Sequence, residues 1–383
     1  MKILFIGICS SYTDGMTYQD QMIVKQCLKD GQETYYISNA QEFKNGVLTD
    51  VPESEKTLPD GLHFWQVKYD FILCKFLTEK IRACKKLGGI IEKINPDVIY
   101  VHGPNAVAIH QVFKYLDKHP EVKFFADSHA DYYTSGTNWV SRTFLHKMIY
   151  KKIYHKCLKY TDKIWCISRN CIRFAKEVYG VPEEKTKLYP LGGFIRSEEE
   201  RKRLREQVRE ENHYGEKEIV FLQAGKMDKN KCLIEALKEF SKCDNCNWKY
   251  VVIGSIAEDI KEQFEQFCSL DKRIQYLGWK NGDEIMQYQA ACDVYMQPGK
   301  VSAIAQNAMC MGAAVALRKF EDYEIFLKGN GWLLETPEQV KEVFFQIANG
   351  EIDLKTYREN SIKVAKEYLD YEMLTRKIYA EDK

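Results

Sequence analysis

The sequence has no long apolar run and no dominant sign of charge. No segment approaches the ~20 consecutive apolar residues that a membrane-spanning helix needs. The apolar start of the chain, within residues 1–7, is too short for a signal peptide, and a polar turn follows it. A formal net charge of +1 over 383 residues gives no bulk electrostatic case for nucleic-acid binding. We therefore expect a cytoplasmic protein without nucleic acid among its partners.

Several chemical signatures are also missing. The GxGxxG, Walker A, HExxH and GxSxG patterns do not occur. The 13 cysteines are odd in number and scattered, which favours reduced thiols over a disulfide framework. A lone CxxC, Cys243 and Cys246, has no second pair at zinc spacing. We expect no metal site.

Short apolar runs alternate with helical periodicity in both halves of the chain, which predicts an α/β fold. In the first half the pattern predicts strands at residues 2–7, 32–38, 97–102, 122–129, 163–168 and 186–191, and helices at 18–29 and 69–94. In the second half it predicts strands at 219–224, 250–254, 274–277, 294–297, 314–317 and 332–334, and helices at 231–242, 257–268, 283–291, 302–311 and 337–349.

This order predicts two Rossmann-like, doubly wound domains, each a parallel sheet covered by helices on both faces. The turn at 190–194 and the charged stretch 197–216, expected to be a solvated helix, mark the boundary. Two such domains leave a cleft between the carboxyl ends of their strands, where open α/β sheets bind ligands.

Two lysines follow the first strand of the second half. Gly225 and Lys226 come directly after the strand, and Lys231 precedes the next helix. Two cations five residues apart, near the free N–H groups of a helix start, suit a diphosphate. The alternative is that both lysines are ordinary surface residues.

A second strand, turn and helix occur at residues 294–311. Gly299 lies in the turn, and the small residues Ser302 and Ala303 would let a phosphate approach the backbone amides. Asn307, one turn into the helix, could reach ribose hydroxyls. The alternative is an ordinary strand-to-helix turn whose small residues only pack against a neighbour. However, this site and the lysine site both lie at carboxyl ends of strands in one domain, and that joint placement favours a ligand.

The first half offers a histidine between two acids. His129 lies just past a strand, flanked by Asp127 and Asp131, and His102 ends the preceding strand. His129 could bind a sugar hydroxyl or stabilise a developing charge, and the alternative is hydrogen bonding without chemistry.

The turn from 7 to 19 is the fourth candidate, because Gly15 would permit close approach of a ligand to the backbone. Residues 139–163 carry seven basic residues against one acid, with aromatic residues interleaved. This stretch is typical of a helix packed on a sheet, and a basic amphipathic stretch can also rest on an anionic membrane.

The chain resembles glycosyltransferase family 4, retaining enzymes of the GT-B fold, over nearly its full length. The motifs that carry the resemblance are Pro96–His102, Tyr189–Gly193, Ala224–Lys226 with Lys231, Leu277-Gly278, Gln297–Gly299, Asn307–Gly312, Glu324 with Asn330-Gly331, and the closing stretch 368–379. The opening segment 15–19 resembles a branch found in polysaccharide and capsule biosynthesis.

The resemblance implies specific roles. Lys226 and Lys231 match the pair that binds the donor diphosphate, and His129 matches a histidine beside the donor sugar. The family commonly has two glutamates separated by seven residues; here the first aligns with Gly299 and the second, which usually holds the ribose, with Asn307. It further implies an acceptor-side domain at 1–190, completed by a final helix at 368–383, and a donor-binding domain at 191–367.

We therefore expect a metal-independent hexosyltransferase without a bound cofactor, its co-substrate a nucleotide sugar. Its donor site comprises Gly225, Lys226, Lys231, Gly299, Ser302, Ala303, Asn307 and Glu324; His129 is the catalytic residue; and Gly15, Tyr18, Gln19, His102 and Asp127 line the acceptor side. The acceptor is a saccharide or a lipid-linked molecule, and transfer retains the anomeric configuration. Two alternatives stay open: a nucleotide-sugar epimerase, and a non-catalytic GT-B scaffold, which the missing acidic pair favours.

Overall fold

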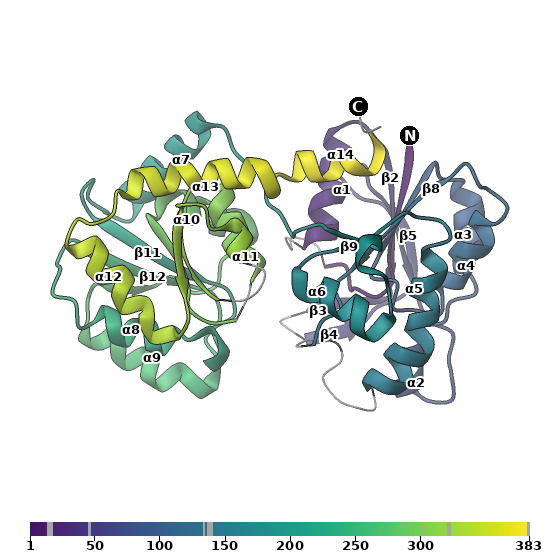
Figure 1. Ribbon diagram of the computed structural model, residues 1–383, viewed down its shortest axis with the longest axis horizontal. Coiled ribbons are helices and arrows are strands. Elements are labelled where there is room, and N and C mark those ends of the chain that lie inside the picture. The colour runs from purple at the N-terminus through teal and green to yellow at the C-terminus, as the bar shows by residue number, and fades with distance from the viewer. Residues whose placement is uncertain are drawn as a thin grey trace. The chain divides into compact units, whose positions relative to one another are not determined.

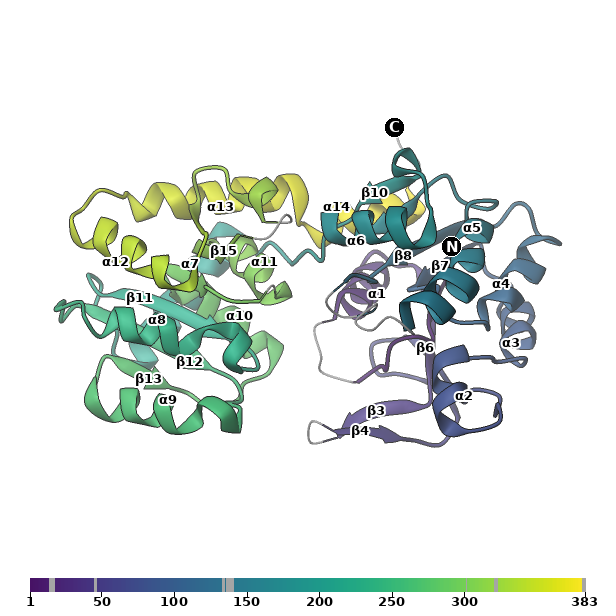
Figure 2. The same cartoon turned by 60° about the horizontal axis from the view of Figure 1, so that its bottom comes forward.

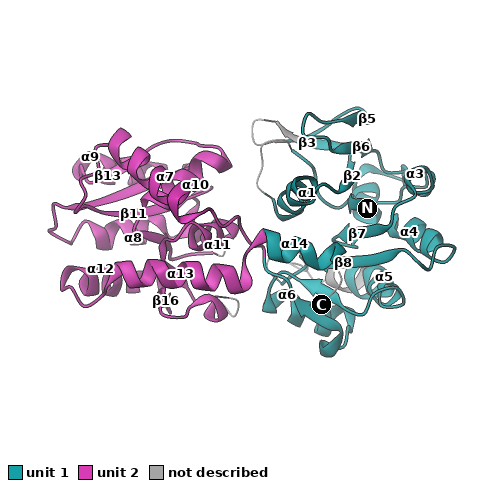
Figure 3. Cartoon of the chain, turned by 90° about the horizontal axis from the view of Figure 1, so that it is seen from above, with its two compact units in different colours: residues 1–190, 372–383 teal, residues 191–371 magenta. Residues whose placement is uncertain are grey.

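The computed structural model describes residues 1–13, 18–44, 47–132, 135, 141–300, 302–319 and 323–380. Contacts divide the chain into two compact units (Figure 3). Unit 1 comprises Met1–Pro190 and Glu372–Lys383, and unit 2 comprises Leu191–Tyr371. The chain thus enters unit 2 once and returns to unit 1 at its carboxyl end.

Unit 1 is built on an eight-stranded sheet (Figure 1). In spatial order its strands are β10 (Thr186–Leu188), β9 (Ile164–Cys166), β8 (Lys123–Ser128), β7 (Val98–His102), β1 (Lys2–Gly7), β2 (Glu33–Asn39), β6 (His63–Val67) and β5 (Ser54–Thr57). All neighbours are parallel except β5 and β6. A separate antiparallel hairpin joins β3 (Gln41–Lys44) to β4 (Val47–Asp50). Strand β1 is buried from its second residue onward, as its apolar run predicts.

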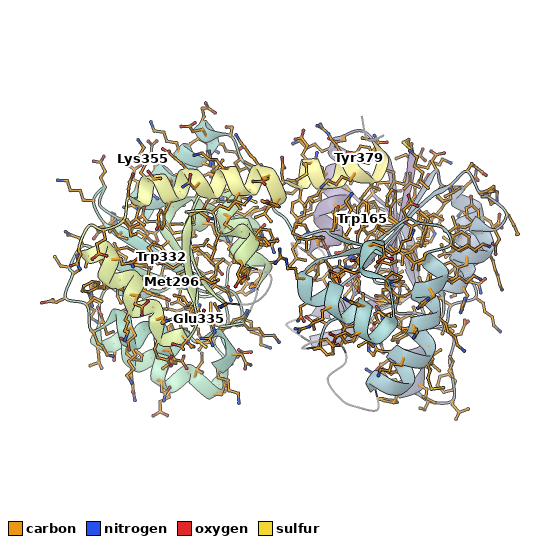
Figure 4. The ribbon with its side chains drawn as sticks, in the orientation of Figure 1. Trp165, Met296, Trp332, Glu335, Lys355 and Tyr379 are labelled. Carbon is orange, nitrogen blue, oxygen red and sulfur yellow. The ribbon has the colours of Figure 1, made fainter. Side chains whose placement is uncertain are left out.

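Helices lie on both sides of this sheet. They are α1 (Gln19–Lys29), α2 (Lys75–Ile81), α3 (Leu87–Ile94), α4 (Ile109–Leu116), the π-helical η1 (Ser141–Tyr150), α5 (Lys151–Cys157), α6 (Arg169–Phe174), the π-helical η2 (Ala175–Tyr179), the 3-10 turn η3 (Glu183–Lys185) and α14 (Tyr371–Tyr379). Tyr379, labelled in Figure 4, donates from its hydroxyl to Asp30 just beyond α1. This contact fixes the C-terminal helix on unit 1.

Two expectations for unit 1 are wrong. The single helix predicted at 69–94 is two helices, α2 and α3, because Arg82 adopts a left-handed backbone conformation (φ 53°) that ends α2. The sheet is also not wholly parallel. Strands β5 and β6 were not predicted, since their runs are short and mix polar residues with apolar ones, as in HFWQV.

Unit 2 contains a six-stranded, fully parallel sheet (Figure 2). In spatial order its strands are β13 (Ile274–Tyr276), β12 (Trp248–Ile253), β11 (Ile219–Ala224), β14 (Val294–Gln297), β15 (Ala314–Arg318) and β16 (Gly331–Leu334). Its helices are α7 (Glu198–Glu211), the 3-10 turn η4 (Lys229–Lys231), α8 (Leu233–Phe240), α9 (Glu258–Leu270), α10 (Gly282–Ala291), α11 (Ala303–Cys310), the 3-10 turns η5 (Glu324–Phe326) and η6 (Pro337–Gln339), α12 (Val340–Ala348) and α13 (Leu354–Tyr368). The predicted fold class, two α/β units with parallel sheets, is confirmed.

The charged stretch after residue 197 is a helix with one anchored side, rather than a purely solvated one. Arg205 Nη2 lies 2.6 Å from Asp293 Oδ1, and Arg209 Nη1 lies 3.4 Å from Asp293 Oδ2. Asp293 directly precedes β14 and also accepts the Val220 amide. The helix is therefore bound to the amino end of the central strands, opposite to their carboxyl edge.

Each unit has its own core. Trp248, Tyr250 and Met296 are fully or almost fully buried in unit 2, and Met296 is labelled on the ribbon of Figure 4. No helix among the described residues is both long and apolar enough to cross a membrane.

Candidate functional site

Two loops meet at the carboxyl edge of the unit 2 sheet, one after β11 and one after β14. The Lys300 amide donates to the Asn230 carbonyl at 2.8 Å, and Lys231 Nζ donates to the Lys300 carbonyl at 3.2 Å. Gly299 lies between them so tightly that an added Cβ would be 2.2 Å from the Asn230 carbonyl oxygen. The two segments that the sequence proposed for the donor are thus in direct contact.

Below these loops, buried polar side chains at the ends of β11 and β14 fix the backbone. Gln223 Nε2 donates to the Lys231 carbonyl at 3.0 Å, and its amide oxygen accepts from the Tyr250 hydroxyl at 2.8 Å. Gln297 Nε2 donates to the Lys300 carbonyl. Gln297 belongs to the Gln297–Gly299 motif named in the sequence analysis, whereas Gln223 was not predicted, because its only signal is a polar residue inside an otherwise apolar strand.

The two lysines differ in their surroundings. Lys226 is exposed, whereas Lys231 is half-buried. Burial lowers the pKa of Lys231; the charge of Lys300 acts in the same direction and that of Asp228 opposes it. Neither Lys226 nor Lys231 forms an ion pair with another described residue, and the Asp228 carboxylate acts on Lys231 only through its longer-range charge.

Glycine is required at Gly225 for a positive φ, at Gly299 for close backbone approach, and at Gly254 for both. Gly225 (φ 122°) and Gly254 (φ 126°) end β11 and β12, and a Cβ on Gly254 would lie 1.8 Å from the Gly225 carbonyl oxygen. A Cβ on Gly225 would be 3.1 Å from Ile304 in the first turn of α11. The loop therefore runs directly over the start of that helix.

At the start of α11, one of the amides expected to face a phosphate is already hydrogen-bonded within the protein. The Ser302 amide donates to the Tyr323 hydroxyl at 3.0 Å, and the Ser302 hydroxyl caps the helix by accepting from Ile304. Ala303 is the first helical residue, whose N–H has no acceptor within the helix. An anion at this end would use Ala303 and its successor, with Ser302 as the cap.

The remaining predicted donor residues lie further from this edge contact. Asn307 is half-buried on α11, where its Oδ1 would be 2.6 Å from a Cβ on Gly193. It therefore packs on the segment by which the chain enters unit 2. Glu324 is exposed at the start of η5.

Replacing Gly299 by alanine tests this loop contact. The added Cβ would lie 2.2–2.7 Å from backbone atoms of Asn230 and Lys231, which cannot move aside as a side-chain tip could. We expect Gly299→Ala to lower unit 2 stability by about 2 kcal/mol and to weaken nucleotide binding, measured by denaturation and calorimetry. Gly89→Ala is the control, because nothing lies within 4 Å of its Cβ position. Equal stability of Gly299→Ala and wild type would contradict the contact.

In unit 1 the carboxylate of Asp127 is the centre of a buried polar cluster. Asp127 is fully buried at the end of β8, beside His102 of β7 in the sheet register. Its Oδ2 accepts from the Tyr100 hydroxyl at 2.7 Å and from His102 Nδ1 at 2.9 Å, and its Oδ1 accepts from the Gly103 amide at 2.8 Å. Burial opposes ionisation of Asp127, but the charges of His102 and His129 hold its pKa well below the usual range.

His129 is placed next to the same carboxylate. Its Nε2 lies 3.3 Å from Asp127 Oδ2, within ion-pair distance, and has no hydrogen-bond partner of good geometry among the described residues. The His102 and His129 rings are in contact, with centroids 4.2 Å apart and planes tilted by 59°. One ligand atom from each of His102, Asp127 and His129 lies within 4.8 Å of the others, a spacing that could hold a metal ion. Hydrogen bonds from Tyr100, His102 and Gly103 already satisfy the carboxylate.

His102 is expected to make the stability of unit 1 depend on pH. Burial alone would lower its pKa, but the charges of Asp127 and Asp20 raise the pKa from its usual 6.5 to about 9. Because the folded pKa is the higher one, the stabilisation is fully present below pH 6.5 and is lost as the pH rises through 9.

The side chain of His102 is 11% exposed, and the pKa difference corresponds to about 3 kcal/mol. Denaturation of wild type and His102→Gln at pH 6 to 9 should show a stability difference that shrinks by that amount. A difference independent of pH would contradict the assignment.

The three acceptor-side residues predicted in the opening segment differ in their surroundings. Gly15 lies outside the described residues. Tyr18 is exposed at the start of α1. Gln19 is buried and donates to the Pro190 carbonyl at 2.8 Å, so it ties α1 to the last residue before unit 2.

Asp20 is a site residue that was not predicted. It is buried and accepts a hydrogen bond from the Tyr36 hydroxyl. Its negative charge raises the pKa of His102. Its Oδ1 has no hydrogen-bond partner among the described residues. An acid in the first turn of a helix looks like an ordinary helix-stabilising residue in sequence, so only the fold shows its position beside the cluster.

Comparison with known proteins adds to this geometry. Residues 204–364 match the model of the family described as glycosyl transferases group 1. No curated protein sequence matches the chain. The fold is similar to that of HepE from Anabaena in complex with UDP, with 16% identity over 99% of this chain and 98% of that chain and a TM-score of 0.67.

Two further solved structures share the fold. A glycosyltransferase from Rickettsia africae has 15% identity over 98% of this chain and 96% of its own, with a TM-score of 0.67. WaaG, a glycosyltransferase involved in lipopolysaccharide biosynthesis, has 13% identity over 100% of both chains, with a TM-score of 0.61. These likenesses show a GT-B fold of two Rossmann-like units. Together with the family match over residues 204–364, in unit 2, this fold supports a glycosyltransferase.

Proposed function

We propose that this glycosyltransferase takes its sugar from a UDP-sugar and binds the diphosphate with Lys226, Lys231 and the first amides of α11. The observation that carries this proposal is the pair of cations at the carboxyl edge of unit 2, neither in an ion pair with a described residue. The half-buried ammonium group of Lys231 is costly without a counter-ion, whereas Lys226 is exposed and free to reach a ligand. A diphosphate supplies that counter-charge, and HepE has been solved with UDP and with UDP-glucose.

The lysines would act mainly on the transition state. Negative charge grows on the diphosphate as the sugar leaves, and prearranged cations stabilise this charge more than that of the intact donor. Lys231 is held in place by the Lys300 carbonyl, and Gly299 keeps the two loops together. In this proposal the lysines replace a divalent metal, and the reaction retains the anomeric configuration as in glycosyltransferase family 4.

Unit 1 would serve the acceptor, a saccharide or a lipid-linked saccharide in polysaccharide biosynthesis. We propose that His129 contacts the sugar being transferred, because its ring is partly exposed just past β8 while its Nε2 faces the Asp127 carboxylate. His102, Asp127, Tyr18 and Gln19 would shape or support the acceptor side.

We also propose that the enzyme works in the cytoplasm and contacts the membrane peripherally through residues 139–163. In the described part of this stretch, Ile153, Tyr154 and Cys157 are buried in unit 1, as expected for a helix packed on a sheet. Its exposed side carries Lys147, Met148, Lys151 and Lys152, a basic surface compatible with an anionic bilayer.

A thermal-shift screen tests the donor. Nucleoside diphosphates and nucleotide sugars are added in the presence of a chelator, since a ligand that binds only the folded protein raises its melting temperature. UDP or a UDP-sugar should give the largest shift. A larger shift with another diphosphate would overturn the choice of UDP, and no shift with any compound would favour a non-catalytic scaffold.

A further inference from the structure

A tight turn and the start of α2 expose three large apolar side chains in unit 1. Phe71, Leu73 and Phe76, here called the apolar tip, are 76%, 86% and 66% exposed. Helix α2 contains no buried residue at all. Single exposed apolar residues are ordinary, but three within six residues mark a contact surface. Figure 1 shows α2 at the periphery of unit 1.

The apolar tip is held by specific hydrogen bonds. Thr78 Oγ1 accepts from the Ile72 amide at 2.8 Å and donates to the Cys74 carbonyl at 3.0 Å. Leu73, at the apex, has a left-handed backbone (φ 52°), which costs a leucine about 1–2 kcal/mol. The chain thus maintains an unfavourable conformation that projects Leu73 into water, where the side chain gains nothing. Such local strain points to a role outside the fold itself.

The segment that carries the tip is rich in basic residues. Between residues 68 and 86 there are six basic residues, Lys68, Lys75, Lys80, Arg82, Lys85 and Lys86, against two acids, Asp70 and Glu79. Lys80 Nζ lies 5.9 Å from the centre of the Phe76 ring. Lys75 pairs with Asp50 and Glu79, and Lys86 pairs with Glu53. Arg82 is partly buried and donates to the Glu79 and Asn105 carbonyls. Lys68, Lys80 and Lys85 form no ion pair with another described residue, so these are the cations left to face an anionic surface.

A second basic segment adjoins the first. The Tyr150 hydroxyl donates to the Lys80 carbonyl, which joins η1 to the end of α2. Residues 141–157 contain Arg142, Lys147, Lys151, Lys152 and Lys156 and no acid. Met148, in the same segment, is 55% exposed.

We propose that the apolar tip inserts into the surface of an anionic phospholipid bilayer, with the surrounding lysines facing the headgroups. Three side chains expose roughly 400 Å² of apolar surface at most, well below the ~800 Å² per partner of a stable protein interface. A bilayer needs only apolar tips and cations, each worth about 1 kcal/mol near an anionic surface. This inference deepens the proposed membrane contact and assigns its anchor to residues 71–76.

The test is co-sedimentation with vesicles of one third phosphatidylglycerol and two thirds phosphatidylcholine, and with vesicles of pure phosphatidylcholine. Wild type should bind the anionic vesicles and release them at high salt, because surface charge is screened. Phe71→Ser/Leu73→Ser/Phe76→Ser should bind at least about tenfold more weakly. The matched control is Leu270→Ser/Phe345→Ser, which removes side chains 84% and 62% exposed in unit 2.

Three results would overturn the proposal: no binding of wild type to anionic vesicles, equal binding of the triple variant, or a wild-type dimer that the triple variant converts to a monomer. The last result would assign the tip to a second copy of the chain. UDP binding measured in solution on the same proteins separates this inference from the donor proposal. If the triple variant loses vesicle binding but still binds UDP, the result supports the role of the apolar tip and leaves the donor proposal untouched.

Discussion

Asp127→Asn is expected to destabilise unit 1 and to abolish most of the transferase activity. The carboxylate accepts from Tyr100, His102 and Gly103 and lies 3.3 Å from His129 Nε2. An asparagine would accept with one oxygen only and would turn an NH2 group toward another donor. Breaking a buried ion pair in this way costs about 3–5 kcal/mol. Misplacing both imidazoles should lower kcat/KM by at least about 100-fold.

Two measurements check this prediction. Chemical denaturation gives the loss of stability, and release of UDP from UDP-glucose gives the activity. The variant should still bind UDP, because the lysines belong to unit 2. A variant as stable and as active as wild type would show that the Asp127 carboxylate neither stabilises unit 1 nor positions His102 and His129 for activity.

Lys231→Ala is expected to have the largest effect on donor use. A charge-assisted hydrogen bond to phosphate contributes about 1.5–3 kcal/mol, so UDP affinity should fall by about 10- to 100-fold. The effect on kcat/KM should be larger, about 100- to 1000-fold, because the lysine also stabilises the charge that develops on the leaving group. Steady-state kinetics with UDP-glucose and calorimetry with UDP measure the two effects.

Lys242→Ala is the matched control in the same unit, since that lysine is 59% exposed and paired with Glu239. If Lys231→Ala and Lys242→Ala bind UDP with equal affinity, the diphosphate assignment fails.

Much of the fold could be predicted from the apolar runs, and the failures have local causes. Strands β1, β11 and β14 have the predicted bounds, because each is a buried run with a clear turn after it. Strand β6 was missed because His63 and Gln66 interrupt its apolar pattern. The helix predicted at 69–94 is interrupted because Leu73 and Arg82 adopt left-handed backbone conformations, which a continuous helix does not contain.

The candidate site was only partly accessible from sequence. Spacing to a predicted strand end was enough to select Lys226, Lys231, His102 and His129. It could not show that one buried carboxylate, Asp127, lies beside both histidines, since that depends on β7 and β8 being neighbours in register. Nor could it show that the Ser302 amide is engaged by Tyr323, which is 21 residues further along the chain.

The central claim is that the carboxyl edge of unit 2 binds the diphosphate of a nucleotide sugar through two lysines. The most direct measurement is calorimetric titration of UDP, with a chelator present, into wild type and Lys226→Ala/Lys231→Ala. Saturable binding by wild type, weakened by at least about 100-fold in the double variant, is the predicted result. Binding of equal strength by both proteins, or no binding by wild type, would contradict the claim.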